Sequence, residues 1–217
     1  KNARLVCTVS HFSKQRIASV YGVPERRIAV IENGWEHFKA VQSDTGVFTR
    51  FPKLKNDNYY FTLGSLSKRK NLAWIASHAA QYADELFAVS GKAISGLVPH
   101  ELESLKKLSN VVLLGYVSDG EVKALMEACT AFIFPSYYEG FGIPPLEALS
   151  CGAQVVCADS ASLPEIYRNC VHYIDPKNPA VDLSSLLAQP TDAPDKILAA
   201  YTYENAAKKL YAALDSL

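Results

Sequence analysis

Two glutamates enclose a short glycine- and proline-containing segment near the middle of the chain. Glu139 and Glu147 are separated by seven residues, Gly-Phe-Gly-Ile-Pro-Pro-Leu. The two glycines let backbone N–H groups approach a ligand closely, and the Pro-Pro pair suits the first turn of a helix, where missing N–H donors cost little. N–H groups at such a helix start bind anions, and the helix dipole strengthens that binding. The segment therefore predicts an anion site between two carboxylates.

These carboxylates could bind hydroxyl groups on either side of that anion. Glu147 falls about one turn into the predicted helix, where it can accept hydrogen bonds from vicinal hydroxyls such as those of a ribose. Glu139 lies on the preceding loop and can reach another part of the same ligand. The alternative is two surface carboxylates near a helix start, which the dipole favours by some tenths of a kcal/mol. That alternative explains the position of Glu147 but not the glycines, so the segment favours a sugar nucleotide as ligand.

A basic cluster follows the first strand of the predicted sheet. Residues 64–71 read Gly-Ser-Leu-Ser-Lys-Arg-Lys-Asn, and Asn71 is in position to cap the next helix. Ligands of open α/β sheets bind outside the carboxyl ends of the strands, so this cluster is well placed for a diphosphate. Lys70 is the side chain that we expect to point inward. The alternative is a solvated run of charges, which is what most such triplets are.

Other motifs, present or absent, limit the classes of ligand that the chain could bind. Gly115-Tyr116-Val117 follows the third predicted strand and could offer backbone contacts to a base, although an ordinary strand-to-helix turn fits equally well. The sequence has no G-x-G-x-x-G and no Walker A loop, which weakens the dinucleotide and nucleotide-triphosphatase readings. It has no D-x-D pair to hold a metal–diphosphate, and the five histidines are dispersed, so we expect no metal site.

The composition is that of an ordinary globular protein. Hydrophobic residues make up 49% of the 217 residues, and 22 basic residues balance 22 acidic ones, which gives no support to a nucleic-acid partner. Five cysteines without C-x-x-C spacing favour reduced thiols and a cytoplasmic location. No apolar run approaches the roughly 20 residues of a membrane span.

From residue 59 onward, short apolar runs alternate with helical segments. The predicted strands cover 59–63, 86–90, 111–114, 131–134, 154–157 and 171–174, and they are apolar on both faces, as buried parallel strands are. The predicted helices cover 71–83, 100–108, 119–129, 144–151 and 164–168, and two or three more follow residue 179, including 204–214. Ser118 and Glu121 form a capping-box signature. This alternation predicts an α/β fold with a doubly wound, Rossmann-like parallel sheet.

The first fifty residues do not belong to that alternation. They predict a strand over 5–9, a helix over 13–21 that Gly22 closes, and a strand over 27–31, followed by a polar, irregular connector over 40–57. A lone strand and helix cannot bury their own apolar faces. We therefore expect residues 1–38 to be the end of a preceding domain and the start of a linker, 39–58 a connector, and 59–217 the ligand-binding domain.

Together these motifs resemble the C-terminal domain of family-4 retaining glycosyltransferases with the GT-B fold. The similarity runs through Gly64 with Lys70-Asn71, then Gly115-Tyr-Val, then the E-x₇-E segment, which continues Ala-Leu-Ser-Cys-Gly. Residues 8–14 and 30–34 resemble the end of the family's first domain and its interdomain linker. The resemblance covers nearly the whole chain, and it implies one half of a GT-B fold that binds a nucleotide-sugar donor.

Residue roles follow from the resemblance. Glu147 would hold the ribose, Glu139 and the backbone from Phe141 to Ile143 would address the transferred sugar, and Lys70 with a neighbouring arginine would neutralise the leaving diphosphate. Glu139 and Lys70 are thus the expected catalytic residues. Many family members carry an arginine where this chain has Ser65, and Arg69 would compensate. The donor site implied in this way comprises Gly64, Ser65, Arg69, Lys70, Tyr116, Val117, Glu139, Gly140, Phe141, Gly142, Ile143, Leu146 and Glu147.

The implied reaction transfers a hexosyl group from a UDP- or GDP-sugar, with retention and without a metal or other cofactor. The Arg69-Lys70-Asn71 and Pro-Pro variants resemble bacterial mannosyltransferases and point to GDP-mannose. The preceding domain would bind a glycan or lipid-linked acceptor in polysaccharide biosynthesis, with peripheral membrane association of the full-length protein, and the isolated chain would catalyse poorly or not at all. Two alternatives stay open: a non-catalytic nucleotide-sugar-binding module, and a sugar-nucleotide epimerase, for which no acid/base set is evident.

Overall fold

A computed structural model describes residues 3–55, 58–64, 67–91 and 100–216, and its centre is a six-stranded parallel sheet in the order β5-β4-β3-β6-β7-β8. The strands are β3 (Tyr59–Leu63), β4 (Leu86–Ser90), β5 (Val111–Gly115), β6 (Ala131–Phe134), β7 (Gln154–Ala158) and β8 (His172–Ile174). All six predicted strands are confirmed, and no boundary moves by more than one residue. The chain runs outward from β3 to β5 and then returns to β6, so the strand order reverses between β3 and β6.

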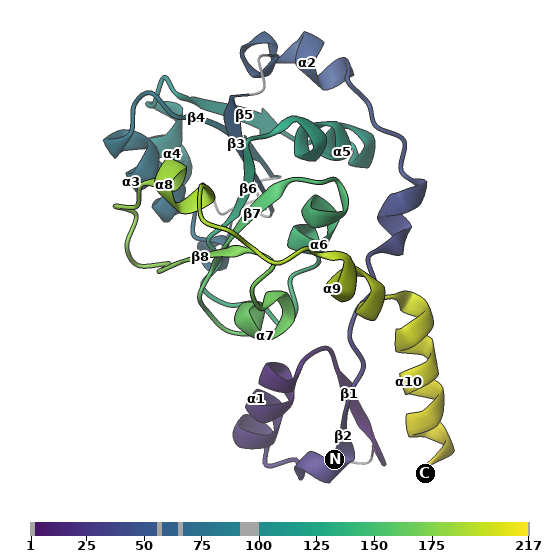
Figure 1. The fold of residues 1–217 in the computed structure, drawn as a ribbon. Coiled ribbons are helices and arrows are strands. Elements are labelled where there is room, and N and C mark those ends of the chain that lie inside the picture. Colours follow the sequence, from purple (N-terminus) through teal and green to yellow (C-terminus); the bar gives the residue numbers. More distant parts are fainter. Residues whose placement is uncertain (1–2, 56–57, 65–66, 92–99, 217) are drawn as a thin grey trace.

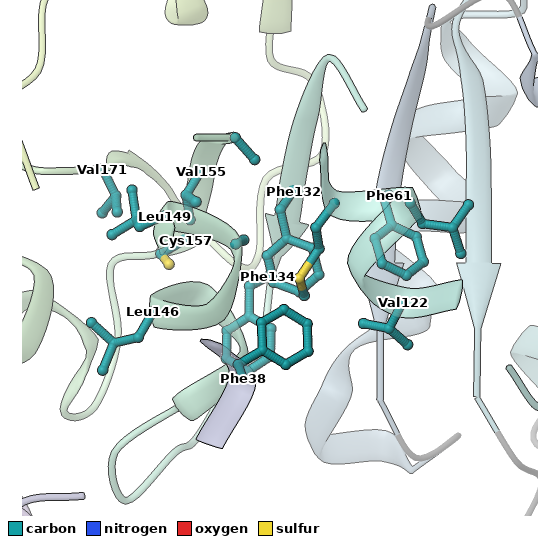
Figure 2. Packing of buried hydrophobic residues seen from close by; sticks show 14 of the residues in the cluster. Phe38, Phe61, Val122, Phe132, Phe134, Leu146, Leu149, Val155, Cys157 and Val171 are labelled. Atoms are coloured by element: carbon teal, nitrogen blue, oxygen red, sulfur yellow. The ribbon is translucent and has the colours of Figure 1, made fainter. Parts of the chain in front are cut away.

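Helices cover both faces of the sheet (Figure 1). One layer contains α3 (Leu72–Gln81), α4 (His100–Lys106) and α8 (Leu183–Leu187), and the other contains α5 (Asp119–Ala128), α6 (Ile143–Ser150) and α7 (Leu163–Tyr167). Successive strand residues alternate between the two layers: Tyr60 and Ile133 pack with α3, whereas Phe61 and Phe132 pack with α5 and α6. Figure 2 shows part of the cluster that contains Phe61 and Phe132. The predicted doubly wound fold is confirmed.

The helices in the alternating region also match prediction, with ends that shift by one or two residues. The capping box before α5 is present: Ser118 Oγ accepts from the Glu121 N–H at 3.3 Å, and the Glu121 carboxylate accepts from the Ser118 N–H at 2.9 Å. After α8, two further helices complete the described chain, α9 (Asp195–Ala200) and α10 (Tyr203–Asp215).

The N-terminal segment forms a separate small unit. β1 (Val6–Thr8) and β2 (Ile28–Val30) pair in parallel, and α1 (His11–Tyr21) connects them. Gly22 ends α1 in the left-handed conformation, with φ of 65°. The helix begins two residues earlier than predicted because the Ser10 side chain caps it. α10 runs back beside β1 and β2 (Figure 1), where Lys209 Nζ lies 2.6 Å from Glu32 Oε2.

The prediction of an irregular connector over 40–57 was wrong in its middle part. Residues there form α2 (Gly46–Arg50) and a 3₁₀ turn, Pro52–Leu54. Val47 and Leu54 are fully buried in the core beside α5, and Phe51 packs against them. These three residues are spaced i, i+4 and i+7, which is one face of a helix. Exposed Thr49, Arg50 and Lys53 stand among them and made the segment look irregular in sequence.

Candidate functional site

Two loops meet at the edge of the sheet where the strand order reverses. One follows β3 and the other follows β6, and these strands are neighbours in the sheet, with Tyr60 paired to Ala131. The Tyr137 N–H donates to the Arg69 carbonyl at 2.9 Å, which ties the two loops together. The carboxyl ends of parallel strands at such a reversal are where open α/β sheets bind ligands.

A carboxylate lies between two cations at this junction. Lys70 Nζ is 2.8 Å from Glu139 Oε1, and Arg69 Nη1 is 2.5 Å from Glu139 Oε2. The Lys70 side chain is only 14% exposed, whereas that of Arg69 is 43% exposed. Burial lowers the pKa of Lys70, and the Glu139 carboxylate opposes that shift. With two cations and one carboxylate, the group carries a net positive charge.

The backbone around Lys70 is shaped to hold it. A Cβ on Gly64 would lie 3.1 Å from Lys70 Cε, so glycine leaves room for the lysine stem. Lys68–Lys70 form a 3₁₀ turn, and Asn71 follows in the left-handed conformation with φ of 56°. The expected side-chain cap by Asn71 is absent: its Nδ2 donates instead to the carbonyls of Pro135 and Pro176, at 3.0 and 2.8 Å. Asn71 therefore joins the loops after β3, β6 and β8.

Side-chain donors hold the carbonyls of the loop 138–142. Arg69 Nη1 donates to Tyr138 O at 2.9 Å, Ser162 Oγ to Glu139 O at 2.9 Å, Ser10 Oγ to Gly140 O at 2.6 Å, and the Tyr167 hydroxyl to Gly142 O. The N–H groups of Phe141, Gly142 and Ile143, by contrast, donate to no acceptor within the described ranges. Unpaired N–H groups beside the start of α6 form an anion-binding arrangement.

Gly142 is the one position of this loop where the backbone requires glycine. It immediately precedes α6 with φ of 87°, a conformation that costs a side chain roughly 1–2 kcal/mol. A Cβ there would also lie 2.9 Å from Leu163 Cδ2, in the buried core. The sharp turn brings the N–H groups of the loop to the first turn of α6.

Glu147 lies on α6, one turn beyond this loop, and has a partner that the sequence did not suggest. Its Oε1 is 2.9 Å from His37 Nε2, which lies in the 3₁₀ turn Glu36–Ala40. The Glu147 side chain is 12% exposed. Burial raises the pKa of Glu147, while the hydrogen bond from His37 lowers it. His37, one of the dispersed histidines, thus supports the carboxylate.

The remaining predicted site residues divide into three cases. Phe141 and Leu146 have buried side chains in the core, so only their backbone could contact a ligand. Gly115 accepts hydrogen bonds from the Gly91 N–H and from Ser90 Oγ, each at 3.1 Å, and its neighbour Tyr116 is 76% exposed while Val117 is buried. No contact within the described part of the chain joins Tyr116 or Val117 to the two glutamates. Ser65 lies outside the described residues.

Sequence reasoning missed several residues that shape the site. They are Ser10, His37, Ser162, Glu165 and Tyr167, and each acts on residues more than 20 positions away. Local spacing carries no signal for such pairs. The Ser-His-Phe-Ser run at Ser10 is a helix-start pattern, but nothing in it indicates what the helix start would contact.

Comparison with known proteins identifies the family. The model for "Glycosyl transferases group 1" matches residues 47–209. The chain belongs to this family. O-antigen chain mannosyltransferase B of Escherichia coli is 30% identical over 186 residues, which cover 82% of this chain and 49% of that protein. O-antigen chain mannosyltransferase RfbU of Salmonella typhimurium is 28% identical over 179 residues, covering 81% and 48%.

This group 1 glycosyltransferase chain thus spans about half the length of those curated relatives. Its fold also matches solved structures. HepE of Anabaena, crystallised with UDP-glucose, superposes with a TM-score of 0.81 at 19% identity, over 99% of this chain and 64% of that one. The lipopolysaccharide outer core galactosyltransferase WaaB superposes with a TM-score of 0.67 at 17% identity. The sheet of this chain is the Rossmann-like half of a GT-B glycosyltransferase.

The described residues contain no group of three or more histidine, cysteine, aspartate or glutamate side chains that could hold a metal ion. Among the described helices, none combines the length and the apolar character needed to cross a membrane.

Proposed function

We propose that this chain binds the diphosphate of a nucleotide sugar between the loops that follow β3 and β6, as the donor half of a retaining glycosyltransferase. The observation that supports this most is the grouping of Lys70, Arg69 and Glu139 beside the unpaired N–H groups of residues 141–143. Two cations, a helix start and a carboxylate suit a diphosphate that is attached to a polyhydroxylated sugar.

Each residue has a role in this proposal. Lys70 and Arg69 neutralise the diphosphate, and Gly64 leaves room for Lys70. Glu139 and the loop backbone from Gly140 to Ile143 address the sugar, and Glu147 accepts hydrogen bonds from the ribose. Backbone groups at Tyr116 and Val117 are the proposed contacts to the base.

The catalytic effect would be electrostatic. As the glycosidic bond breaks, negative charge collects on the leaving β-phosphate. Fixed cations and N–H groups that are aimed at this charge lower the barrier, because they need no reorganisation during the reaction. Lys70 and Arg69 carry the charge that a divalent cation supplies elsewhere, so the proposed reaction needs no metal.

The identity of the donor rests on the relatives. Two of them are named O-antigen chain mannosyltransferases, which supports GDP-mannose as donor and a role in polysaccharide biosynthesis. HepE was crystallised with UDP-glucose, so a UDP-sugar is the competing choice. We further propose that the whole protein acts in the cytoplasm on a glycan or lipid-linked acceptor, in peripheral contact with the membrane.

Membership of a glycosyltransferase family favours an enzyme over the alternatives of a binding module or an epimerase. The proposal is tested by ligand-observed NMR with a panel of UDP-, GDP- and ADP-sugars on the 217-residue chain. We expect saturation transfer to one sugar nucleotide, and loss of that signal in Lys70→Ala combined with Glu147→Ala. Equal signals in the wild-type and doubly substituted chains would overturn the assignment of the site.

A further inference from the structure

The loop that carries Glu139 is also held by the N-terminal segment. Ser10, which is fully buried, donates from Oγ to the Gly140 carbonyl at 2.6 Å. The same oxygen accepts from the Ser13 N–H at 3.1 Å, so Ser10 caps α1 and binds the loop at once. Ser13 Oγ lies 3.3 Å from the same carbonyl. Gly140 is thereby joined to residues about 130 positions earlier in the chain.

Glu165 on α7 fixes the start of α1 above this loop. Its Oε1 accepts from the His11 N–H and its Oε2 from the Phe12 N–H, both at 2.8 Å. A carboxylate at the first two N–H groups of a helix is doubly favourable, because it satisfies orphan donors and complements the dipole. The Phe12 ring also meets the Tyr138 ring edge to face, with centroids 5.3 Å apart.

We propose that Ser10 and Glu165 are positioning residues for the donor site, so that the N-terminal segment sets the geometry of Glu139. This inference rests on the proposed function. The other held carbonyls of the loop are bound by Arg69, Ser162 and Tyr167, all from the sheet domain. Gly140 alone is held from the N-terminal segment, and it stands directly after Glu139.

The physical reason lies in the backbone of the loop. Glycine loses more conformational freedom on ordering than any other residue, and this loop contains two. If Gly140 were not held, the cost of ordering the loop would fall on donor binding and would weaken it. The linkage is reciprocal: a donor that needs the ordered loop also stabilises the contact between α1 and the sheet domain.

The test uses Ser10→Ala, Ser10→Thr and a matched control, Asp182→Ala. Asp182 caps α8 on the opposite layer, where its side chain accepts from the Ser185 N–H at 2.9 Å, so the control loses a helix cap without touching the loop. Titration calorimetry gives the dissociation constants for GDP-mannose and GDP, and for UDP-glucose and UDP. We expect Ser10→Ala to reduce the preference for the sugar nucleotide over its diphosphate roughly tenfold, the usual size of one lost buried hydrogen bond.

Ser10→Thr keeps a hydroxyl and should restore the preference, and Asp182→Ala should leave it unchanged. A general loss of stability would weaken the binding of the sugar nucleotide and of its diphosphate alike. The ratio of the two dissociation constants therefore separates an effect on the geometry of the loop from an effect on folding. If Ser10→Ala does not fold, Glu165→Gln serves instead, because it removes one of the two acceptors and should lower the ratio in the same direction. An unchanged ratio in a folded variant would overturn the inference.

A second readout does not depend on donor binding. Backbone ¹⁵N relaxation should give order parameters near 0.85 for residues 139–142 in the wild type and clearly lower values in Ser10→Ala, with β6 unaffected. Equal order parameters in the two chains would contradict the inference. If the wild type bound none of the four probes, the proposed function would fail, while these order parameters would still decide whether Ser10 holds the loop.

Discussion

Lys70 Nζ and Glu139 Oε1 lie 2.8 Å apart, although the two residues are 69 positions apart in the sequence. The contact joins the first βα loop of the sheet domain to the first loop beyond the strand-order reversal. Lys70 also lies 4.5 Å from the centroid of the Phe134 ring at the end of β6, so its ammonium is held from two sides. A cation fixed in this way is already in position when charge develops nearby.

Lys70→Ala should damage turnover in the full-length enzyme more than it damages donor binding. In the bound donor, several N–H groups share the diphosphate charge, whereas extra charge collects on the β-phosphate in the transition state. Only interactions that strengthen in the transition state raise the rate. We expect kcat to fall roughly 10²-fold, since Arg69 is close enough to compensate in part.

The measurement is steady-state kinetics with varied donor, and Lys106→Ala on α4 is the control because Lys106 forms an exposed pair with Glu103 far from the site. A higher KM with unchanged kcat would show that Lys70 provides only uniform binding.

Donor affinity should not depend on a divalent metal. The positive charge at the site comes from Lys70 and Arg69, together with N–H groups at the start of α6. Titration of the preferred nucleotide sugar in EDTA and in excess magnesium should give the same dissociation constant. A large loss of affinity on chelation would mean that the phosphate site is wrongly assigned.

Donor binding should weaken toward acid pH, and His37 should set where this happens. Burial raises the pKa of Glu147 above 4.5, the His37 hydrogen bond opposes this, and Asp119 adds to it. His37→Ala removes the opposing contribution, so the ionised form of Glu147 should be lost at a higher pH. We expect the midpoint of affinity against pH to move upward in His37→Ala.

The same shift predicts the sign of a stability change. Because the folded protein holds the Glu147 proton more tightly than the unfolded chain does, this group makes stability fall as pH rises from 4.5 through the raised pKa. His37→Ala should enlarge that fall, and Glu147→Gln should remove it. Identical pH profiles for wild type and His37→Ala, in binding and in denaturant unfolding, would contradict the assigned contact.

Gly142→Ala should destabilise the fold more than Gly152→Ala. Both glycines have positive φ, of 87° and 81°, so both substitutions carry a similar backbone cost. A Cβ at Gly142 would also lie 2.9 Å from Leu163 Cδ2, whereas a Cβ at Gly152 would meet no atom of the described chain within 4 Å. The difference between them should be about 1–3 kcal/mol, the cost of overpacking a core. Urea unfolding of the two variants measures this difference in stability. Equal midpoints would show that the Leu163 side chain moves aside at no energetic cost.

Most of the fold was predictable because its signals are local. The strand from Tyr59 to Leu63 is apolar at every position except Thr62, as suits a strand buried between two helix layers, and Ser118 with Glu121 marks a helix start within four residues. The prediction of an irregular connector over 40–57 was wrong because the signal there was not local in this way. The buried positions Val47 and Leu54 are interleaved with exposed Thr49, Arg50 and Lys53, so composition suggested a loop where spacing indicated a helix.

The site was less predictable, because sequence can indicate which loops come together but not how side chains pair across them. The strand-end rule placed Lys70 and Glu139 at the same sheet edge. No local pattern relates Glu147 to His37, or Gly140 to Ser10, because these contacts depend on how the linker and the N-terminal helix pack. Asn71 illustrates a further limit: a residue type favoured at helix caps took the left-handed conformation and used its amide to join two loops instead.

Glu147 provides the sharpest test of nucleotide-sugar binding at this site. Glu147→Ala should weaken binding of the preferred nucleotide sugar by about 1–3 kcal/mol, the cost of losing charge-assisted hydrogen bonds to ligand hydroxyls. Glu127→Ala is the control, because Glu127 is a glutamate on α5 whose exposed carboxylate accepts a hydrogen bond from Ser43 Oγ at 2.7 Å. The measurement is titration calorimetry of wild type, Glu147→Ala and Glu127→Ala with the nucleotide sugar selected from the panel. We predict weaker binding for Glu147→Ala alone, with all three chains folded; equal dissociation constants for wild type and Glu147→Ala would contradict the assigned site.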